Sequence, residues 1–292
     1  IGEGEWVVMR TDWDQRADDE GALVFDTEKL DEAIDLVGAA VLELDLSVDK
    51  PVAQLAVRLN DVRPDGSVTR ITYALKNLCH RDSHEFPAEL VPGERYRVRI
   101  QLDDIAWHLP AGHTLRLSIS TCYWPLMWPS PQPVTLSVHT NSSVLQVPVR
   151  RPVPGEKPPV FPEPVAAPPL EQAELRPPAH KREVSVDPDT GEHRMDIVDD
   201  FGAYRNLTHG LVTGTVAREV HTIKPDDPLS AAMATHWTET LARGDWSLRT
   251  ETTSRMTASA THFHLTARIE AYEDDELIFE KDFDETIGRQ LG

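Results

Sequence analysis

The chain has 292 residues, which is enough for two domains of ordinary size. Its 29 lysines and arginines stand against 49 aspartates and glutamates, a formal net charge of −20. This acidic balance argues against nucleic acid or an anionic membrane as a partner, because both need a basic footprint. The sequence has no run of about 18 apolar residues that could form a transmembrane helix.

The start of the chain, Ile1-Gly-Glu-Gly-Glu-Trp6, has neither an initiator methionine nor the apolar segment of a signal peptide. We interpret this start as the middle of a longer protein. Two cysteines, Cys79 and Cys122, are too few for a disulfide framework. They are typical of reduced thiols in a cytoplasmic protein.

Residues 40–150 alternate apolar and polar side chains in about seven segments, the period-2 pattern of strands with one buried face. Such faces are buried when two sheets stack or a barrel closes. We therefore predict an all-β fold, a jelly-roll β-sandwich over residues 1–151, with residues 1–38 as an extended lead-in. The expected inward positions are Ala40, Leu42, Leu44, Leu46, Val48, Leu55, Val57, Leu59, Ile71, Tyr73, Leu75, Tyr96, Val98, Ile100, Leu102, Leu115, Leu117, Ile119, Val134, Leu136, Val138, Leu145, Val147 and Val149.

The composition changes sharply after this region. Residues 152–181 are rich in proline, which predicts an extended linker; docking to an SH3-like partner is the alternative. Residues 182–292 return to alternation, with turn signals at Gly244-Asp245 and Asp274-Asp275. They predict a second antiparallel region of three or four long strands in meander order, preceded by a hairpin.

Two Trp-Pro pairs follow the predicted strand at residues 115–119. Proline lacks a backbone donor and extends the residue before it, so the pairs end the strand and stiffen the segment that follows. Large aromatic side chains on a rigid segment are suited to packing against a neighbouring domain, and we expect them to be partly exposed or covered by another surface when that neighbour is absent. The predicted domain-interface residues are Tyr123, Trp124, Pro125, Trp128 and Pro129.

Other patterns leave alternatives open. Trp107, Trp124 and Trp128 could form a carbohydrate-binding platform, which makes a free-standing glycan-binding module the alternative function. His262 and His264 share one face of a predicted strand, and with His236 they could bind zinc, although a solvated polar face explains them as well. The acidic run at residues 270–276 lacks the ligand spacing of a calcium loop. We predict neither a metal nor another cofactor.

Serine-nucleophile chemistry has no sequence signal here. The sequence contains no Gly-x-Ser-x-Gly motif, which places a nucleophilic serine on a strained turn. We therefore predict no catalytic residue, and no activity for this chain alone.

A set of short segments resembles the C-terminal part of the CocE/NonD family of serine hydrolases, which includes acyl esterases and enzymes like X-Pro dipeptidyl-peptidase. The set covers roughly residues 20–150, and residues 225–256 resemble the extra C-terminal region of long acyl esterases. The segments are Leu23-Val-Phe-Asp-Thr27, Leu36-Val-Gly-Ala-Ala-Val-Leu-Glu-Leu44, Pro51-Val-Ala-Gln-Leu-Ala-Val-Arg-Leu59, Val62-Arg-Pro-Asp-Gly-Ser67, Leu90-Val-Pro-Gly-Glu94, Leu109-Pro-Ala-Gly-His-Thr-Leu-Arg-Leu117, Tyr123-Trp-Pro125, Pro225-Asp-Asp-Pro-Leu-Ser230, Trp246 and Ser254-Arg-Met256.

The resemblance implies a galactose-binding-like jelly roll that packs against an α/β-hydrolase domain and shapes its active site. In the family, the catalytic serine, acid and histidine belong to that hydrolase domain, and no segment of this chain corresponds to it. The implied partner is therefore the hydrolase domain of a parent esterase or X-Pro amide hydrolase. A homo-oligomer is left open.

Overall fold

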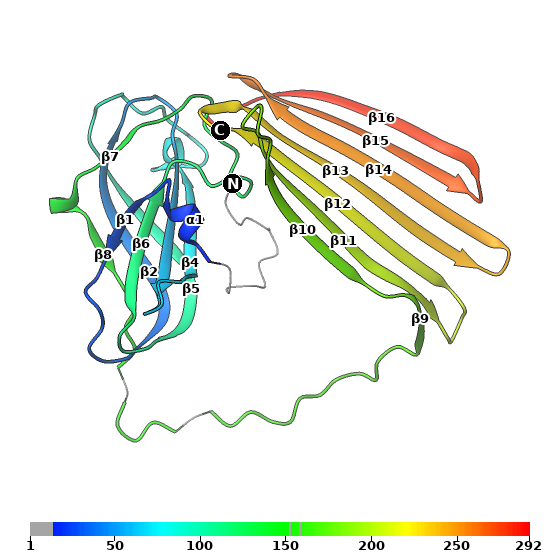
Figure 1. The fold of residues 1–292 in the computed structure, drawn as a ribbon, viewed down its shortest axis with the longest axis horizontal. Coiled ribbons are helices and arrows are strands. Elements are labelled where there is room, and N and C mark those ends of the chain that lie inside the picture. Colours follow the sequence, from blue (N-terminus) through cyan, green and yellow to red (C-terminus); the bar gives the residue numbers. More distant parts are fainter. Residues whose placement is uncertain (1–13, 152, 158) are drawn as a thin grey trace. The chain divides into compact units, whose positions relative to one another are not determined.

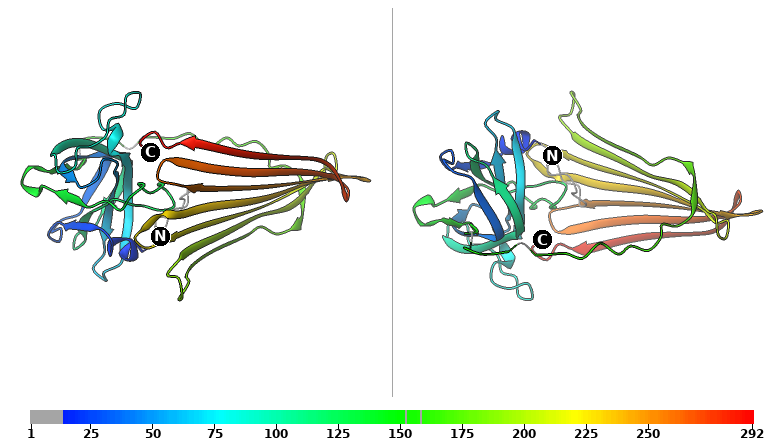
Figure 2. Two further views of the ribbon diagram at one scale, coloured as in Figure 1. Left: turned by 90° about the horizontal axis from the view of Figure 1, so that it is seen from above. Right: turned by 90° about the horizontal axis from the view of Figure 1, so that it is seen from below.

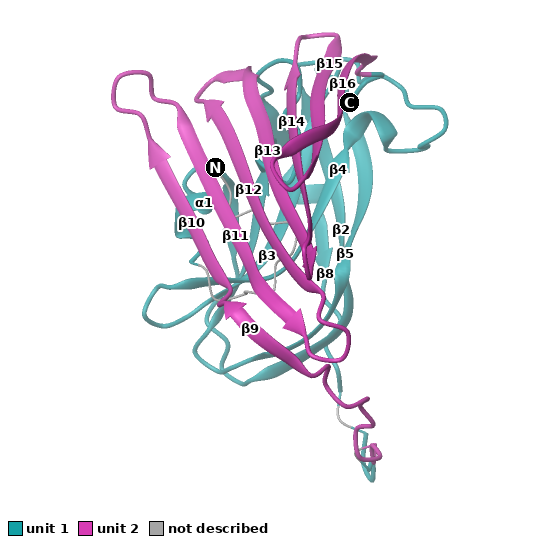
Figure 3. Ribbon diagram, turned by 90° about the vertical axis from the view of Figure 1, so that its right-hand side faces the viewer, with its two compact units in different colours: residues 1–157, 290–292 teal, residues 158–289 magenta. Residues whose placement is uncertain are grey.

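The structure is a computed structural model that describes residues 14–151, 153–157 and 159–292. Residues 1–13, on which the interpretation of the chain's start rests, lie outside the described part. The chain divides into two compact units, residues 1–157 with 290–292 and residues 158–289 (Figure 3). No helix in the described residues has the length and apolar character of a transmembrane segment.

Unit 1 contains two antiparallel sheets of four strands each (Figure 1). In the first sheet β6 lies between β1 and β3, and β4 pairs with β3; in the second, β2 pairs with β5, β7 and β8. This confirms the prediction of an all-β antiparallel fold. The strands are β1 (Leu23–Asp26), β2 (Ile34–Val48), β3 (Gln54–Val62), β4 (Val68–Asn77), β5 (Tyr96–Leu109), β6 (Thr114–Ser120), β7 (Leu136–Val138) and β8 (Val144–Gln146); the helical turns are α1 (Arg16–Asp19), η1 (Leu78–His80) and η2 (Thr140–Ser142).

The core of unit 1 forms from the alternating apolar positions of both sheets. Leu42, Leu44 and Leu46 of β2 and Leu55 and Leu59 of β3 are at most 1% exposed and belong to one cluster. Burying an aliphatic side chain of this size contributes about 1.5–3 kcal/mol. The sequence pattern therefore identified the side chains that β2 and β3 place in this core. Three other positions expected inward do not belong to it: Tyr73 and Leu75 contact Tyr123 and its cluster, and Val149 is 45% exposed.

The predicted lead-in is more structured than an extended segment. Within residues 14–38 the chain forms α1, β1 and the first residues of β2. β1 pairs with β6 through Leu23–Asp26, with Phe25 opposite Leu117. A four-residue strand and a single helical turn are too short to give a sequence period, so alternation could not reveal them.

Unit 2 is built from one antiparallel sheet in meander order, in which neighbouring strands lie side by side from β10 to β16 (Figures 1 and 2). The four predicted long strands are confirmed as β13 to β16, whereas the long strands β11 and β12 were not predicted. Two hairpins turn in two-residue loops whose first residue, Gly244 or Asp274, has positive φ, as tight hairpin turns require. The strands are β9 (Gln172–Arg176), β10 (Ala179–Val186), β11 (His193–Asn206), β12 (Val212–Lys224), β13 (Asp227–Arg243), β14 (Trp246–Ala258), β15 (His262–Glu273) and β16 (Glu276–Gly288).

The segment assigned to the linker is only partly without secondary structure. Residues 153–157 and 159–171 form no strand, whereas β9 and the start of β10 lie inside the predicted range 152–181. β9 pairs with residues 203–206 of β11. The division into domains at residues 151 and 181 stays a prediction.

Residues 290–292 belong to unit 1 although β16, which precedes them, belongs to unit 2. Leu291 packs against the core of unit 1. Its carbonyl oxygen accepts a hydrogen bond of 2.7 Å from Asn77 Nδ2. The chain therefore passes between the two units twice.

Candidate functional site

The strand β3 is buried on both of its faces. Leu55, Val57 and Leu59 point into the core of unit 1, as the alternation predicts. Arg58 and Asn60 lie on the opposite face, where an alternating pattern predicts solvent, yet they are 1% and 0% exposed. Two other parts of unit 1 contact this outer face: residues 15–19 and the segment that follows β6. The polar residues gathered there, called the Arg58 cluster below, are Gln15, Asp18, Asp19, Arg58, Asn60, Arg70, Arg116, Ser118 and Tyr123.

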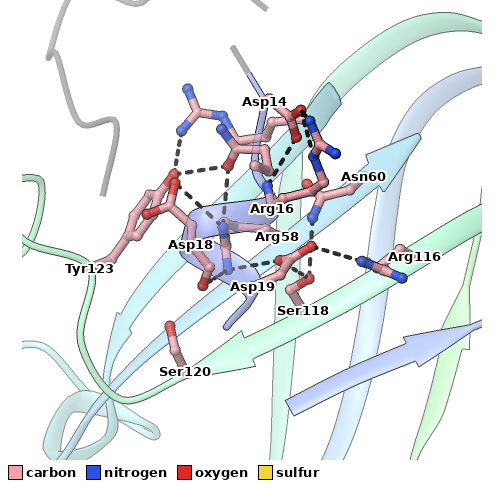
Figure 4. A network of polar contacts seen from close by, with 12 residues as sticks. Asp14, Arg16, Asp18, Asp19, Arg58, Asn60, Arg116, Ser118, Ser120 and Tyr123 are labelled. Carbon is pink, nitrogen blue, oxygen red and sulfur yellow. Dashed lines mark hydrogen bonds and ion pairs between the residues drawn. The ribbon is translucent and has the colours of Figure 1, made fainter. Parts of the chain in front are cut away.

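Arg58 holds the segment around α1 against the sheet (Figure 4). Its Nη1 donates to Gln15 Oε1 at 3.2 Å, and its Nη2 donates to the Asp18 carbonyl oxygen at 2.9 Å. Arg58 Nη2 also lies 3.1 Å from Asp19 Oδ1, and Nη1 lies 3.8 Å from Asp18 Oδ2. Because the guanidinium is 1% exposed, these contacts take the place of its hydration.

Asp19 links this arginine to β6. Its Oδ1 accepts a 2.7 Å hydrogen bond from the Ser118 hydroxyl, and its Oδ2 lies 3.1 Å from Arg116 Nη1. Asn60 Nδ2 donates in turn to Ser118 Oγ at 3.1 Å. Arg116 also makes two 2.7 Å hydrogen bonds to Asp26, and these bonds are the main reason why its pKa is raised above the ordinary value.

Tyr123 closes the other side of the cluster. Arg70 Nη1 donates to the Tyr123 hydroxyl oxygen at 2.7 Å, and the hydroxyl lies 3.4 Å from Gln15 Oε1. The Arg58 guanidinium lies 5.2 Å from the centre of the Tyr123 ring, a cation–π distance. Burial raises the pKa of Tyr123, so the phenol stays protonated at neutral pH.

The predicted interface residues lie in the segment that follows β6, next to this cluster. Tyr123 and Trp124 are each 3% exposed, Pro129 is buried, and Pro125 and Trp128 are partly buried. The Trp124 and Trp128 rings meet edge to face, with centroids 4.9 Å apart and planes at 85°. The rings are therefore mostly covered in the described structure, and their role at a domain interface stays a prediction.

A small apolar cluster anchors the same segment to β3. Met127 and Tyr123 pack on Ala56, and the Met127 amide donates to the Tyr123 carbonyl oxygen at 3.0 Å. Ser130 Oγ accepts a 3.1 Å hydrogen bond from the Gln54 amide. The segment is thus held at both ends by contacts to one strand.

The Ser118 hydroxyl and two histidine rings of unit 1 each contact a carboxylate. The Ser118 hydroxyl is bonded to a carboxylate and an amide, which is no arrangement for a nucleophile and its base. His108 and His113 bond Asp35 and Asp61, at 2.8 and 2.7 Å.

The histidines considered as zinc ligands are not brought together. His236 lies on β13, and the whole of β14 separates it from His262 and His264 on β15. His236 Nε2 lies 2.8 Å from Glu251 Oε2. The described residues contain no group of three His, Cys, Asp or Glu side chains placed to hold a metal ion. Both cysteines are free thiols, and burial is the main cause that raises the pKa of Cys79.

Sequence reasoning missed the Arg58 cluster. Arg58 and Asn60 occupy the polar positions of an alternating strand, which are typical of a solvated face. The usable signal was the concentration of Asp18, Asp19 and Arg16 just before a strand, since charges near a buried strand need partners. Nothing in the sequence indicates which arginine they meet.

Comparison with known families identifies unit 1. A family model described as the X-Pro dipeptidyl-peptidase C-terminal non-catalytic domain matches residues 3–158. The chain belongs to this family. The resemblance to the C-terminal part of the CocE/NonD hydrolases is thereby confirmed. The match ends where unit 2 begins, at residue 158.

Several solved structures of longer proteins are similar to about half of this chain. They include an α-amino acid ester hydrolase labelled with selenomethionine (22% identity, TM-score 0.46, covering 48% of this chain and 28% of that chain). They also include an aminopeptidase from a marine sediment Thaumarchaeota archaeon (20% identity, TM-score 0.46, covering 48% of this chain and 28% of that chain). A third is a CocE/NonD family hydrolase from Staphylococcus aureus (16% identity, TM-score 0.39, covering 47% of this chain and 32% of that chain). The chain thus spans less than a third of each, and no curated protein sequence gives a significant match.

Proposed function

We propose that this chain is the non-catalytic C-terminal portion of a CocE/NonD-like serine hydrolase and that it packs against an α/β-hydrolase domain and shapes the mouth of its active site. The parent enzyme hydrolyses esters or X-Pro amides, and its catalytic residues lie in the hydrolase domain. The observation that carries the proposal is the family match over residues 3–158.

The Arg58 cluster supports the scaffold role. Residues that line an active site act well only when their neighbours hold them within a fraction of an ångström. Here residues 15–19 and the Trp-Pro segment are fastened to the same strand by buried hydrogen bonds and by Met127. A segment fixed in this way loses little conformational entropy when a partner docks on it.

The test is association with a separately produced α/β-hydrolase domain of a family member. We expect the chain alone to show no turnover of p-nitrophenyl acetate or an X-Pro-nitroanilide, and the two parts together to bind and to hydrolyse one of them. Turnover by the purified chain that a serine-directed phosphonate abolishes would contradict the proposal.

Variants of the Trp-Pro segment test where the hydrolase domain docks. We expect Trp124→Ala with Trp128→Ala to weaken this association more than Trp246→Ala, which changes a 39% exposed tryptophan of unit 2. Thermal unfolding of each variant supplies the control, because Trp124 is buried. If unfolding collapses while binding per folded molecule is unchanged, these tryptophans are core residues and the interface lies elsewhere.

The alternative of a free-standing glycan-binding module receives no support from the tryptophan pair. Stacking on a sugar needs an open ring face, and Trp124 is 3% exposed. A glycan array probed with the full chain discriminates the two functions.

A further inference from the structure

The sheet of unit 2 has one apolar face and one polar face. Residues that lie directly opposite each other on neighbouring strands have their side chains on the same face of a sheet. One such row crosses four strands of unit 2: Thr235 on β13, Ser254 on β14, Ala267 on β15 and Phe283 on β16. Because side chains alternate along each strand, every second residue counted from this row lies on the same face. The large apolar side chains that β13 to β16 place on this side, called the Trp237 face, are Met233, Trp237, Leu241, Trp246, Leu248, Met256, Phe263, Leu265, Ile269, Phe279, Phe283 and Ile287.

The other side of the same strands carries charges and hydroxyls. Arg268 bonds Glu270 and Asp282 there, and Arg249 bonds Glu251. An amphipathic sheet of this kind is stable in water when a second layer covers its apolar face. The described residues of unit 2 contain one sheet and no helix, so unit 2 supplies no such layer itself.

The Trp237 face is open to solvent at its rim. Leu241, Phe279, Phe283 and Ile287 are 39%, 50%, 44% and 51% exposed. Exposed apolar patches that gather on one face, rather than scattering singly, mark interaction surfaces. The family model ends at residue 158, so the domain that it describes does not include this face.

We propose that the Trp237 face binds the same face of a second copy of this chain, so that two sheets stack into a sandwich around a twofold axis. Four strands about 4.8 Å apart and about nine residues long present roughly 600 Å² per copy. Two such faces together bury about 1,200 Å², which reaches the size of a specific interface. Face-to-face stacking is the ordinary way in which two sheets cover each other.

The charges on the Trp237 face favour a second copy. Glu239 lies on β13 between Trp237 and Leu241, and Lys281 lies on β16 between Phe279 and Phe283. Two strands separate them, a distance of about 14 Å, so they cannot pair within one chain. A twofold axis along the strands places β13 of one copy over β16 of the other. Glu239 then lies over Phe279, one cross-strand row (about 7 Å) from Lys281 of the other copy, and the two long side chains can bridge that span twice in the dimer.

The shape of the face fits the same axis. The row of Thr235, Ser254 and Ala267 is made of small side chains, and it lies between rows that carry Met233 or Trp237. Phe283 ends this small row on β16. Under the twofold axis, Phe283 of each copy lies over Thr235 of the other, so that a large side chain meets a shallow row.

The test is the oligomeric state of the full chain, measured by sedimentation velocity from about 1 to 100 µM. We expect a dimer that tightens as salt rises, since two molecules of net charge −20 repel each other at low ionic strength. Phe283→Glu should raise the dimer Kd about 100-fold, because the symmetric interface contains the substitution twice. Thr286→Glu is the matched control, since Thr286 lies on the same strand and points to the polar face.

A charge exchange tests the pairing itself. Glu239→Lys and Lys281→Glu should each weaken the dimer, and the double variant should recover most of the loss. A chain that stays monomeric at 100 µM in physiological salt would overturn the proposal, whatever covers the face instead. Equal weakening by Phe283→Glu and Thr286→Glu would also overturn it. Neither outcome bears on the proposed function, because the hydrolase domain is absent from these measurements.

Discussion

The two units use the same strand pattern and bury it differently. In unit 1 two sheets cover each other, and even the outer face of β3 is closed by Arg58, Asn60 and their partners. In unit 2 one sheet leaves aromatic and aliphatic side chains half exposed. Period-2 alternation therefore indicates which side chains share a face, but not whether water or protein covers that face.

A substitution of Arg58 tests most directly whether the covered outer face of β3 stabilises unit 1. We expect Arg58→Met to destabilise unit 1 by about 3–5 kcal/mol, because Asp18 and Asp19 lose a buried guanidinium that offsets the desolvation of their carboxyl groups. Arg97→Met is the control, since the Arg97–Glu43 pair is exposed and worth less than about 1 kcal/mol. Urea unfolding followed by hydrogen exchange resolves the two units separately. Equal effects of the two changes would show that the cluster is not a structural requirement.

Tyr123→Phe tests the same cluster with a smaller change. The variant removes the hydroxyl that accepts from Arg70 and leaves a buried guanidinium donor unsatisfied, so we expect a loss of roughly 2 kcal/mol. Tyr73→Phe, on the neighbouring strand β4, serves as the control, because Tyr73 contacts Arg70 through its ring. The measurement is urea unfolding of unit 1. A loss as small as that of the control would contradict this view of Tyr123.

The dependence of stability on pH tests the comparison in unit 2. Hydrogen bonds from Arg218, and then from Arg194, lower the pKa of Asp196 from 3.8 to about 2. The carboxylate therefore contributes stability above about pH 4, and this contribution is lost as pH falls toward 2. After allowance for partial exposure, we expect roughly 1 kcal/mol. Asp196→Asn should flatten the stability of unit 2 over that range, and an unchanged slope would contradict the assignment.

The smallest expected effect is at the histidines of β15. His262 and His264 are exposed, and their ring nitrogens lie within hydrogen-bond distance of the hydroxyls of Thr261 and Thr286. Changing both to Gln should alter stability by less than about 1 kcal/mol, as surface substitutions do. The measurement is thermal unfolding with metal analysis of the purified protein. Stoichiometric zinc that the double variant loses would contradict it.

These contrasts show what the sequence could reveal. The alternation at Leu42, Leu44 and Leu46 predicted the core, and the turn residues at Gly244 and Asp274 predicted the hairpins, because both are local properties. The contact of Arg58 with Asp19 is not local. It depends on which segment folds over the outer face of β3, and a polar residue at that position looks the same whether water or a carboxylate meets it.

The tryptophan segment illustrates the same limit. Proline chemistry predicted a stiff segment beyond β6, and the structure places Trp124 and Trp128 in edge-to-face contact there. The burial of Trp124 could not be predicted, because it depends on packing. The strands inside the proline-rich range were also missed, since an extended segment and an edge strand have nearly the same backbone conformation.

The return of residues 290–292 to unit 1 ties the two units together thermodynamically. Held at both ends, unit 2 unfolds into a closed loop of about 130 residues rather than into a free tail. Closing a loop of that length removes about 4 kcal/mol of chain entropy. The burial of Leu291 and the hydrogen bond from Asn77 thus act on unit 2 as a reversible cross-link does. The stabilisation of unit 2 cannot exceed the free energy with which these contacts hold the end of the chain. A substitution at Leu291 would therefore lower the stability of a sheet to which the residue does not belong.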